Sequence, residues 1–483
     1  MYSPKRALVW HAMTVRGRTS MSQGQVPYKE LISAARKTES KALEMLGELV
    51  RFPSCAARDH KTIVECADHV EAQLRAFGYS VKQFPTKGSP VVYAVKDAGA
   101  GKSLLFYHHY DVQPEDPLDL WKSDPWKLEI KDGRVFGRGV VDNKGPYVAD
   151  LLGMDLLERS LGKLPVNVKF LVEGEEEVGS MHLGDFTREN ASFLESDGAV
   201  NEMLVSTPGS PSEIYCGVKG DVYFELKVGG SPTFPNRDVH SGYANAIPNA
   251  AWRLIWALST LKDKDDRITI DGWDALVREI SEEDRAVLKE YGEDLEAALK
   301  ADYGLGKTLL GRKGLELVES VFMRPSVTIS GFGSGYQGPG SKTIVPCTAS
   351  AKVDFRLVPD LTPDKAEELL KAHLVRKGFG DIEVTMLDTA FDPSKTPVTD
   401  PFIRLVHECS AEVVVPARCS ILPMGFGSGP VELFARYAPT CFAWSRADSS
   451  GTNLHAPNES WPVGSLSNEM AFVALVAQRL GSS

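Results

Sequence analysis

The sequence of 483 residues has no apolar run near the ~18 residues that a membrane-spanning helix needs. Its first apolar stretch, Ala7–Trp10, is also shorter than the ~7–15 residues at the centre of a secretory signal. No membrane partner is therefore expected. Residues 1–20 are expected to be a disordered tail or the product of an upstream start, because a clean helical pattern begins only after Met21.

Basic residues are also fewer than acidic ones. Lys and Arg number 54 against 65 Asp and Glu, which gives a net charge of -11. Proteins that bind a phosphate backbone carry a basic footprint, so nucleic acid is not expected to be the main partner. With 43% hydrophobic and 25% charged residues, the chain has the composition of a globular protein rather than that of a disordered one.

Cysteine pairs are the third absence. The chain has seven cysteines, an odd number, and none of them lies in a C-x-x-C pair. This pattern argues against a disulfide framework and against a cysteine-based zinc site. It is typical of reduced, scattered thiols, and a cytoplasmic location is expected.

Outside residues 215–392, the chain alternates helices with short apolar strands. Such alternation is typical of an α/β layer built on a mostly parallel sheet. The sequence predicts helices at 31–50, 62–77 and 147–159, and strands at 91–95, 104–107, 166–172 and 441–444.

A different pattern occupies residues 215–392. Strand, helix, two strands, helix and strand follow one another there, which is the order of a ferredoxin-like α+β domain. The predicted elements are 222–228, 247–261, 327–330, 349–357, 363–375 and 382–386. Acidic, helix-forming sequence at 262–317 interrupts this order. We therefore expect a larger, discontinuous domain of residues 21–214 and 393–483, with the smaller domain inserted at 215–392.

Histidines and acids gather where predicted strands end. The strand at 104–107 is followed by the segment HHYD, which contains His108, His109 and Asp111. In an extended backbone His109 and Asp111 point to the same side, so Asp111 can accept the second N–H of a metal-bound imidazole. Two histidines that form hydrogen bonds and have only a structural role explain the segment about equally well. For His108 this structural interpretation is preferred.

The segment Glu173–Glu177 holds four carboxylates directly after an apolar strand. These carboxylates repel one another, and their pKa values rise unless a cation offsets the charge. A solvated acidic loop is the usual explanation of such a run. Because this run follows a strand with a buried pattern and is followed by Gly179-Ser180, we favour a metal-binding or an acid–base role. One of Glu176 and Glu177 would then bind a metal ion, and the other would transfer a proton.

Three further segments, around Asp142, Glu202 and His455, are each uninformative alone, since a surface turn or loop explains any of them. Together with His109 and Glu177 they supply two histidines and three carboxylates. Nitrogen and oxygen donors without thiolate suit zinc or a similar divalent ion. One carboxylate can bridge two such ions ~3.5–4 Å apart.

The order of the motifs resembles one known family. YHHYDVQP, GRGVVDNKGP, EGEEEVGS, the Glu202 segment, DVHSG and NLHAPNE follow one another as in the di-zinc metallopeptidases. That family includes cytosolic dipeptidases, carnosinases, glutamate carboxypeptidase, aminoacylase and succinyl-diaminopimelate desuccinylase. The resemblance covers nearly the whole chain from about Thr38. It implies a zinc-exopeptidase-like catalytic domain with helices around a mostly parallel sheet, and an inserted ferredoxin-like lid and dimerisation domain.

The resemblance also implies the ligands of two metal ions. Asp142 would bridge them, His109 and Glu202 would complete the ligands of one ion, and Glu177 and His455 those of the other. The catalytic residues that it implies are Glu176 as general base, Asp111 orienting a ligand, and His240 reaching a neighbouring subunit's active site to stabilise the oxyanion. The implied substrate-binding residues are Arg356, Thr343 and Ser428.

Three departures from the family pattern stand out. His108 takes the place of a small residue before the ligand histidine, the loop GFGSGP lacks a double glycine, and Glu202 is longer than the Asp of some relatives.

The implied reaction is metal-dependent hydrolysis of the amide bond in dipeptides or short peptides with a free carboxylate. It uses two divalent ions, zinc before manganese or cobalt, in a homodimer. N-acyl amino acids are the alternative substrates. A catalytically silent binding protein ranks below both, because no ligand or base is missing.

Overall fold

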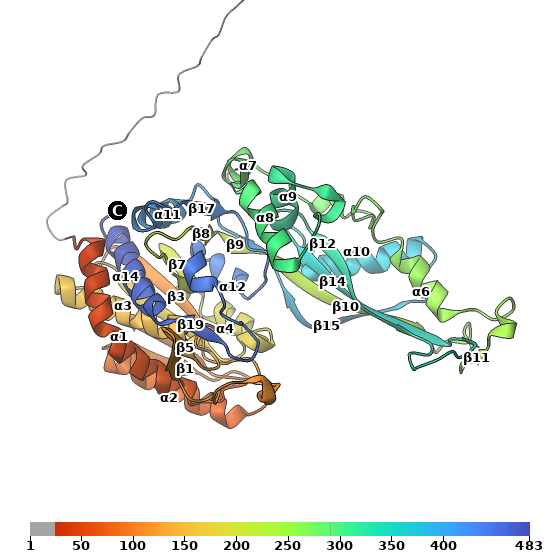
Figure 1. The fold of residues 1–483 in the computed structure, drawn as a ribbon, viewed down its shortest axis with the longest axis horizontal. Coiled ribbons are helices and arrows are strands. Elements are labelled where there is room, and N and C mark those ends of the chain that lie inside the picture. Colours follow the sequence, from red (N-terminus) through yellow and green to blue (C-terminus); the bar gives the residue numbers. More distant parts are fainter. Residues whose placement is uncertain (1–24, 290) are drawn as a thin grey trace, which may run out of the picture.

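The computed structural model describes residues 25–289 and 291–483, so the expectation for residues 1–20 lies outside the described part. Two lobes are visible in Figure 1: a larger one formed by the early and late parts of the chain, and an elongated one formed by the middle part. Among the described helices, none combines the length and the apolar character needed to cross a membrane.

The larger lobe is built on an eight-stranded sheet in the order β1-β2-β6-β3-β7-β18-β8-β17. Its central strands β6, β3, β7 and β18 run parallel, whereas β1 and β2 are antiparallel at one side and β8 is antiparallel to β18. The expected mostly parallel sheet is confirmed. The strands are Ser80–Phe84 (β1), Val91–Lys96 (β2), Ser103–His109 (β3), Asn167–Glu173 (β6), Gly198–Leu204 (β7), Ser212–Tyr215 (β8), Cys419–Leu422 (β17) and Thr440–Ser445 (β18).

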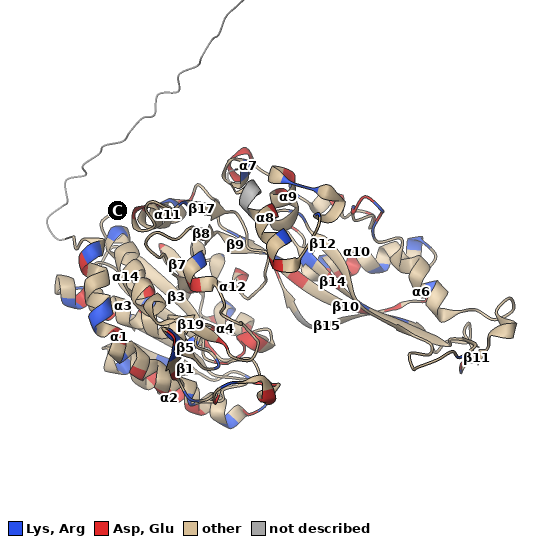
Figure 2. Ribbon diagram, viewed as in Figure 1, with Lys and Arg blue, Asp and Glu red and all other residues tan. Residues whose placement is uncertain are grey.

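Long helices cover this sheet because their apolar residues recur at helical spacing. In α1, for example, Leu31, Ala35, Ala42 and Leu46 are fully buried. In Figure 2, Lys and Arg alternate with Asp and Glu on the outward sides of α1 and α2. The helices of this lobe are Tyr28–Val50 (α1), His60–Ala76 (α2), Lys144–Leu161 (α3), Leu183–Glu189 (α4), Ala191–Leu194 (α5), Pro401–Val413 (α11), Glu432–Ala435 (α12), Arg446–Ser449 (α13) and Val463–Leu480 (α14).

The smaller lobe has a four-stranded antiparallel sheet in the order β12-β14-β10-β15. In sequence its elements follow the predicted order of strand, helix, two strands, helix and strand. They are Gly220–Gly229 (β10), Ala250–Leu258 (α6), Ser326–Ser334 (β12), Thr348–Leu357 (β14), Pro363–Arg376 (α10) and Glu383–Phe391 (β15). β12 extends four residues past the predicted end. A separate buried core holds this lobe together, while the limits 215–392 stay a prediction.

The acidic stretch at 262–317 forms helices, as expected: Glu282–Lys289 (α7), Gly292–Tyr303 (α8) and Gly314–Phe322 (α9). Leu288 and Phe322 pack against Leu422 and Met424 of the larger lobe, so these helices bridge the two lobes. Short strand pairs complete the fold: Gly217–Val218 (β9) with Ser394–Lys395 (β16), Val239–His240 (β11) with Ile344–Val345 (β13), and a three-stranded sheet of Glu129–Lys131 (β4), Arg134–Phe136 (β5) and Ser460–Pro462 (β19).

Candidate metal centre and active site

The candidate metal ligands lie at one edge of the large sheet. His109 is the last residue of β3 and pairs in register with Glu173, the last residue of β6. Glu202 lies near the end of the neighbouring parallel strand β7. The carboxyl ends of parallel strands meet at a common edge, which is where open α/β sheets place their ligands. Three segments far apart in sequence are thereby brought together.

Asp142 stands between the two histidines. Its Oδ1 lies 2.9 Å from His109 Nε2, and its Oδ2 lies 3.0 Å from His455 Nε2. Each oxygen of this one carboxylate therefore faces a different imidazole. The segment around Asp142 is a buried loop between β5 and α3, not the surface turn that the isolated motif suggests, since Val140 and Val141 are buried.

Glu177 and Glu202 complete the group. A carboxylate oxygen of Glu177 lies 3.4 Å from His455 Nε2, and the ligating atoms of His109, Asp142 and Glu177 all fall within 4.8 Å of one another. Glu202 and His455 have positive φ angles of 61° and 58°. Non-glycine residues rarely adopt this conformation, which costs of order 1–3 kcal/mol and is concentrated at functional sites.

The electrostatics of the group favour a cation. Burial, reinforced by the charge of Asp142, raises the pKa of Glu177 to about 8, and burial raises that of Glu202 to about 7. The hydrogen bond to Asp142 raises the pKa of His455 to about 8. Buried carboxylates of this kind are stabilised in their charged form by a metal ion, and two imidazoles with three carboxylates suit zinc or a similar divalent ion.

Asp111 fixes two parts of the site at once. The Nδ1 of His109 lies 3.1 Å from the main-chain carbonyl oxygen of Asp111 and 3.4 Å from its carboxylate. The carboxylate also accepts the main-chain N–H groups of Glu176 and Glu177 at 3.2 and 3.0 Å. It therefore positions both an imidazole and the short 3₁₀ turn Glu176–Val178 that follows β6. Burial, with Glu202 and Glu177 nearby, raises the pKa of Glu176 well above its usual range.

Glu459 is not assigned a role from the sequence alone. One carboxylate oxygen accepts bonds from Arg138 and the Gly139 N–H, and the other accepts the N–H groups of Val141 and Asp142, at 2.9–3.2 Å. Glu459 therefore connects the Asp142 loop to the loop that carries His455. Only its place in the NLHAPNE motif could have drawn attention to it.

Two more side chains support the group from behind. The Gln113 amide donates to the Glu177 carboxylate at 2.8 Å, and Asn143 donates to the main-chain oxygen of Glu202 at 3.1 Å. His108 points away from the ligands into the core, where its Nδ1 lies 2.6 Å from the Asn143 Oδ1. Burial lowers the pKa of His108 to about 3, so this ring is neutral. This agrees with the structural interpretation of His108.

Arg356 and Ser428 meet between the lobes. A guanidinium nitrogen of Arg356, on β14, donates to the Ser428 hydroxyl at 2.9 Å. The neighbouring Gly429 lies beside the Glu176 carboxylate, because a Cβ added there would be 3.6 Å from its Oε1. The smaller lobe thus contacts the loop next to Glu176 through Arg356.

His240 and Thr343 are not brought to this group. His240 ends β11, and Thr343 directly precedes its partner strand β13; the Ser241 N–H donates to the Thr343 carbonyl at 3.0 Å. Both side chains are exposed. Figure 1 shows β11 at the tip of the smaller lobe, far from the larger one. Within one chain, the site therefore lacks these two predicted residues.

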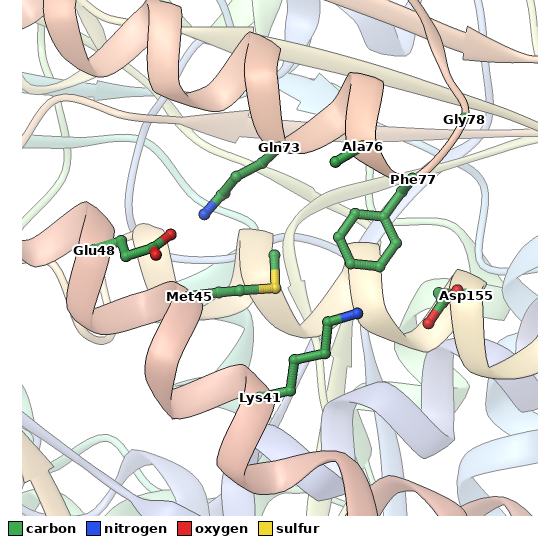
Figure 3. A pocket seen from close by; sticks show the side chains of 8 residues that line it. All are labelled: Lys41, Met45, Glu48, Gln73, Ala76, Phe77, Gly78 and Asp155. Carbon is green, nitrogen blue, oxygen red and sulfur yellow. The ribbon is translucent and has the colours of Figure 1, made fainter.

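A cavity elsewhere carries no such chemistry. It has a volume of about 590 Å³ and lies between α1 and α2, with Asp155 of α3 at one side. Figure 3 shows the Lys41 ammonium beside the Phe77 ring, and the two are 4.3 Å apart. None of its lining residues belongs to the carboxylate–imidazole group.

Comparison with known proteins identifies the family. The model of peptidase family M20/M25/M40 matches residues 105–479. The chain belongs to this family. Its members are metal-dependent, and the donor set described above fits that property.

Individual relatives agree. The chain is 32% identical over 294 residues to a Beta-Ala-His dipeptidase of Rattus norvegicus, covering 59% of the chain and 58% of the relative. It is 31% identical over 278 residues to a Cys-Gly metallodipeptidase DUG1 of Saccharomyces cerevisiae, covering 56% of each. The matches thus span little more than half of these relatives. The structure of an M20 family metallo-carboxypeptidase from Sulfolobus solfataricus superposes with a TM-score of 0.82 and 34% identity, over 92% of this chain and all of that one.

Proposed function

We propose that the chain is a metal-dependent dipeptidase, which hydrolyses the amide bond of dipeptides or short peptides that have a free carboxylate. The observation that carries this proposal is the position of Glu176, whose main-chain N–H is held by the same Asp111 carboxylate that contacts the ligand His109. A proton-accepting carboxylate is thereby fixed beside a group of metal ligands. Family membership and relatives named as dipeptidases support dipeptides over the alternative N-acyl amino acids.

The residues have distinct roles in this proposal. His109, Asp142, Glu177, Glu202 and His455 would hold two divalent ions, for which zinc is the first choice. Such ions would supply a lowered pKa, towards ~7, for a coordinated water and would polarise the substrate carbonyl. Glu176 accepts the proton of the attacking water and delivers it to the leaving amine. Arg356 binds the substrate carboxylate through its planar fork, assisted by Ser428.

We further propose that the active protein is a homodimer. His240 and Thr343 are exposed and remote from the metal ligands, so a second subunit is needed to bring them to the site. An exposed strand and an exposed helix of the smaller lobe suit such contact: Ile329 and Phe332 of β12 are about half exposed, as are Trp252 and Trp256 of α6. Light scattering after size-exclusion chromatography tests this, and a monomer that is fully active would contradict it.

A cytoplasmic location is part of the same proposal. All seven cysteines are free, and five of them are buried. Unpaired thiols persist in reducing compartments. Cell fractionation with an antibody against the native protein tests the location.

The decisive experiment joins metal content to activity. Gently purified protein should contain about two divalent ions per chain, and a chelator should abolish dipeptide hydrolysis until zinc, manganese or cobalt is restored. Parallel assays with N-acetyl amino acids separate the two substrate classes. A protein that binds no metal and hydrolyses no dipeptide after any of these ions is added would overturn the proposal in favour of a silent binding protein.

A further inference from the structure

A large cavity lies next to Arg356 and has no role in the function proposed so far. Its volume is about 750 Å³, and it is enclosed by the helices α8 and α9, the start of β12 and the side chain of Phe426. Figure 1 shows α8 and α9 beside β12, at the end of the small sheet that is nearest the larger lobe. The cavity therefore adjoins the place where the two lobes meet.

The charged residues that line this cavity are mostly cationic. Six cations face it, Lys219, Lys262, Arg267, Arg312, Arg324 and Arg356, against the four acids Asp266, Asp274, Glu316 and Glu319. Asp266 is shared by Lys262 and Arg312, Arg267 pairs with Asp263, and Glu319 pairs with Arg285. In the described part of the chain, no ion pair is formed by Lys219.

Lys219 is a buried cation without a carboxylate partner among the described residues, and it lines the cavity. It is 3% exposed, and its ammonium donates to the Arg324 carbonyl oxygen at 2.6 Å. An ammonium has three N–H donors, so two remain for other partners. Leaving a charge buried and unpaired is costly. Burial, and the charge of Arg356, lower the pKa of this lysine to about 8, which leaves it charged at neutral pH.

Main-chain hydrogen bonds fix the position of Lys219 relative to the loop that contains Ser428. Its main-chain N–H donates to the Gly425 carbonyl at 3.3 Å, and the Gly425 N–H donates to the Gly217 carbonyl at 2.7 Å. Gly425 begins the loop that contains Ser428, which accepts the bond from Arg356. Asp354 and Asp221 lie 3.3 and 3.8 Å from the Arg356 guanidinium, but neither of them lines the cavity.

We propose that this cavity is a second anion-binding subsite, in which Lys219 binds the acidic side chain of a substrate's carboxy-terminal residue. The inference rests on the proposed dipeptidase function, in which Arg356 binds the α-carboxylate of the same residue. Arg356 lines the cavity, so a side chain on the residue that it holds can enter the cavity. The buried ammonium of Lys219 then acquires the carboxylate partner that residues 25–289 and 291–483 do not provide.

The test compares dipeptides that differ only in the charge of this side chain. With zinc-loaded full-length protein, kcat/KM for Ala-Glu should exceed that for Ala-Gln by about tenfold or more, as expected for one charge-assisted hydrogen bond. The substitution Lys219→Met should remove most of this ratio, and Lys219→Arg should retain most of it. Lys262→Met is the matched control, because Lys262 lines the same cavity but is already paired with Asp266; it should leave the ratio unchanged.

Binding of free L-glutamate and L-glutamine, measured by calorimetry on the same proteins, separates this inference from the proposed function. Tighter binding of glutamate that Lys219→Met abolishes, without hydrolysis of any dipeptide, would support the subsite and overturn the dipeptidase. Hydrolysis with equal kcat/KM for Ala-Glu and Ala-Gln would overturn the subsite alone. An equal loss on both substrates in Lys219→Met would also overturn it, because Lys219 would then act only through its bond to Arg324.

Discussion

In the larger lobe, His109 and Asp142 lie in contact, and several hydrogen bonds from the surrounding residues hold the loops that carry the metal ligands. In the smaller lobe, His240 and Thr343 are exposed at the ends of a two-residue strand pair. The first arrangement is preorganised, because Asp111 and Glu459 hold the loops before any substrate arrives. In the proposed homodimer, the second arrangement would present its residues to the neighbouring subunit. The proposal thus assigns the metal centre to the larger lobe and the residues that complete it to the smaller lobe of a second subunit.

The largest expected effect removes the base from the preorganised lobe. Glu176→Ala should lower turnover by about 10²–10⁴-fold, because no other carboxylate replaces the proton acceptor at that position. Metal content, measured by mass spectrometry, should stay at the wild-type level. Glu175→Gln is the matched control, since the Glu175 carboxylate is engaged by the Ser89 N–H and by His182. Wild-type turnover in Glu176→Ala would refute the assignment of the base.

The second prediction concerns the exposed lobe. His240→Ala alone should lower kcat by about 10²–10³-fold, as loss of an oxyanion donor does. Mixed with Glu176→Ala protein and allowed to exchange subunits, it should recover activity, because one site of each mixed dimer has both residues intact. Random exchange gives about a quarter of the wild-type activity. If His240 acted within its own chain, both sites of the mixed dimer would lack a residue and no activity would return.

The third prediction tests how the ligand loops are held. Glu459→Gln replaces a carboxylate oxygen that accepts N–H groups with an amide NH2 group, which is itself a donor and cannot accept them, so the Asp142 loop should loosen. Metal affinity, measured by competition with a chromogenic chelator, should fall by about 10–100-fold. Glu412→Gln alters a surface ion pair with Arg479 and is the control. Unchanged affinity in Glu459→Gln would show that the loop keeps its position without this carboxylate.

The fold was largely predictable because its signals are local. Alternating apolar strands and helices defined the larger lobe, and the strand–helix order at 222–386 defined the smaller one. The metal group was predictable only through the order of its motifs, since the segments of Asp142, Glu202 and His455 carry no signal alone. The rest depends on long-range contacts: the four N–H groups that Glu459 accepts, and the positive φ of Glu202 and His455, arise only once distant segments meet.

The smallest expected effect is a pH dependence that distinguishes the cavity from the metal centre. Burial lowers the pKa of Lys219 to about 8, so its ammonium is charged at pH 7 and mostly neutral at pH 9. The ratio of kcat/KM for Ala-Glu to that for Ala-Gln should therefore fall by about five- to tenfold over this range. The titration of the metal ligands cancels in the ratio, since both substrates share that site.

The neighbours of Lys219 do not produce this fall. The Arg356 and Arg324 guanidinium groups stay charged throughout the range, and the substrate's acidic side chain stays ionised. In Lys219→Arg the cation also persists, so the ratio should be flat between pH 7 and 9 while the separate kcat/KM values still follow the metal centre. A flat ratio in the wild-type protein would show that Lys219 does not bind the substrate. The cavity would then be only a gap in the packing around α8 and α9.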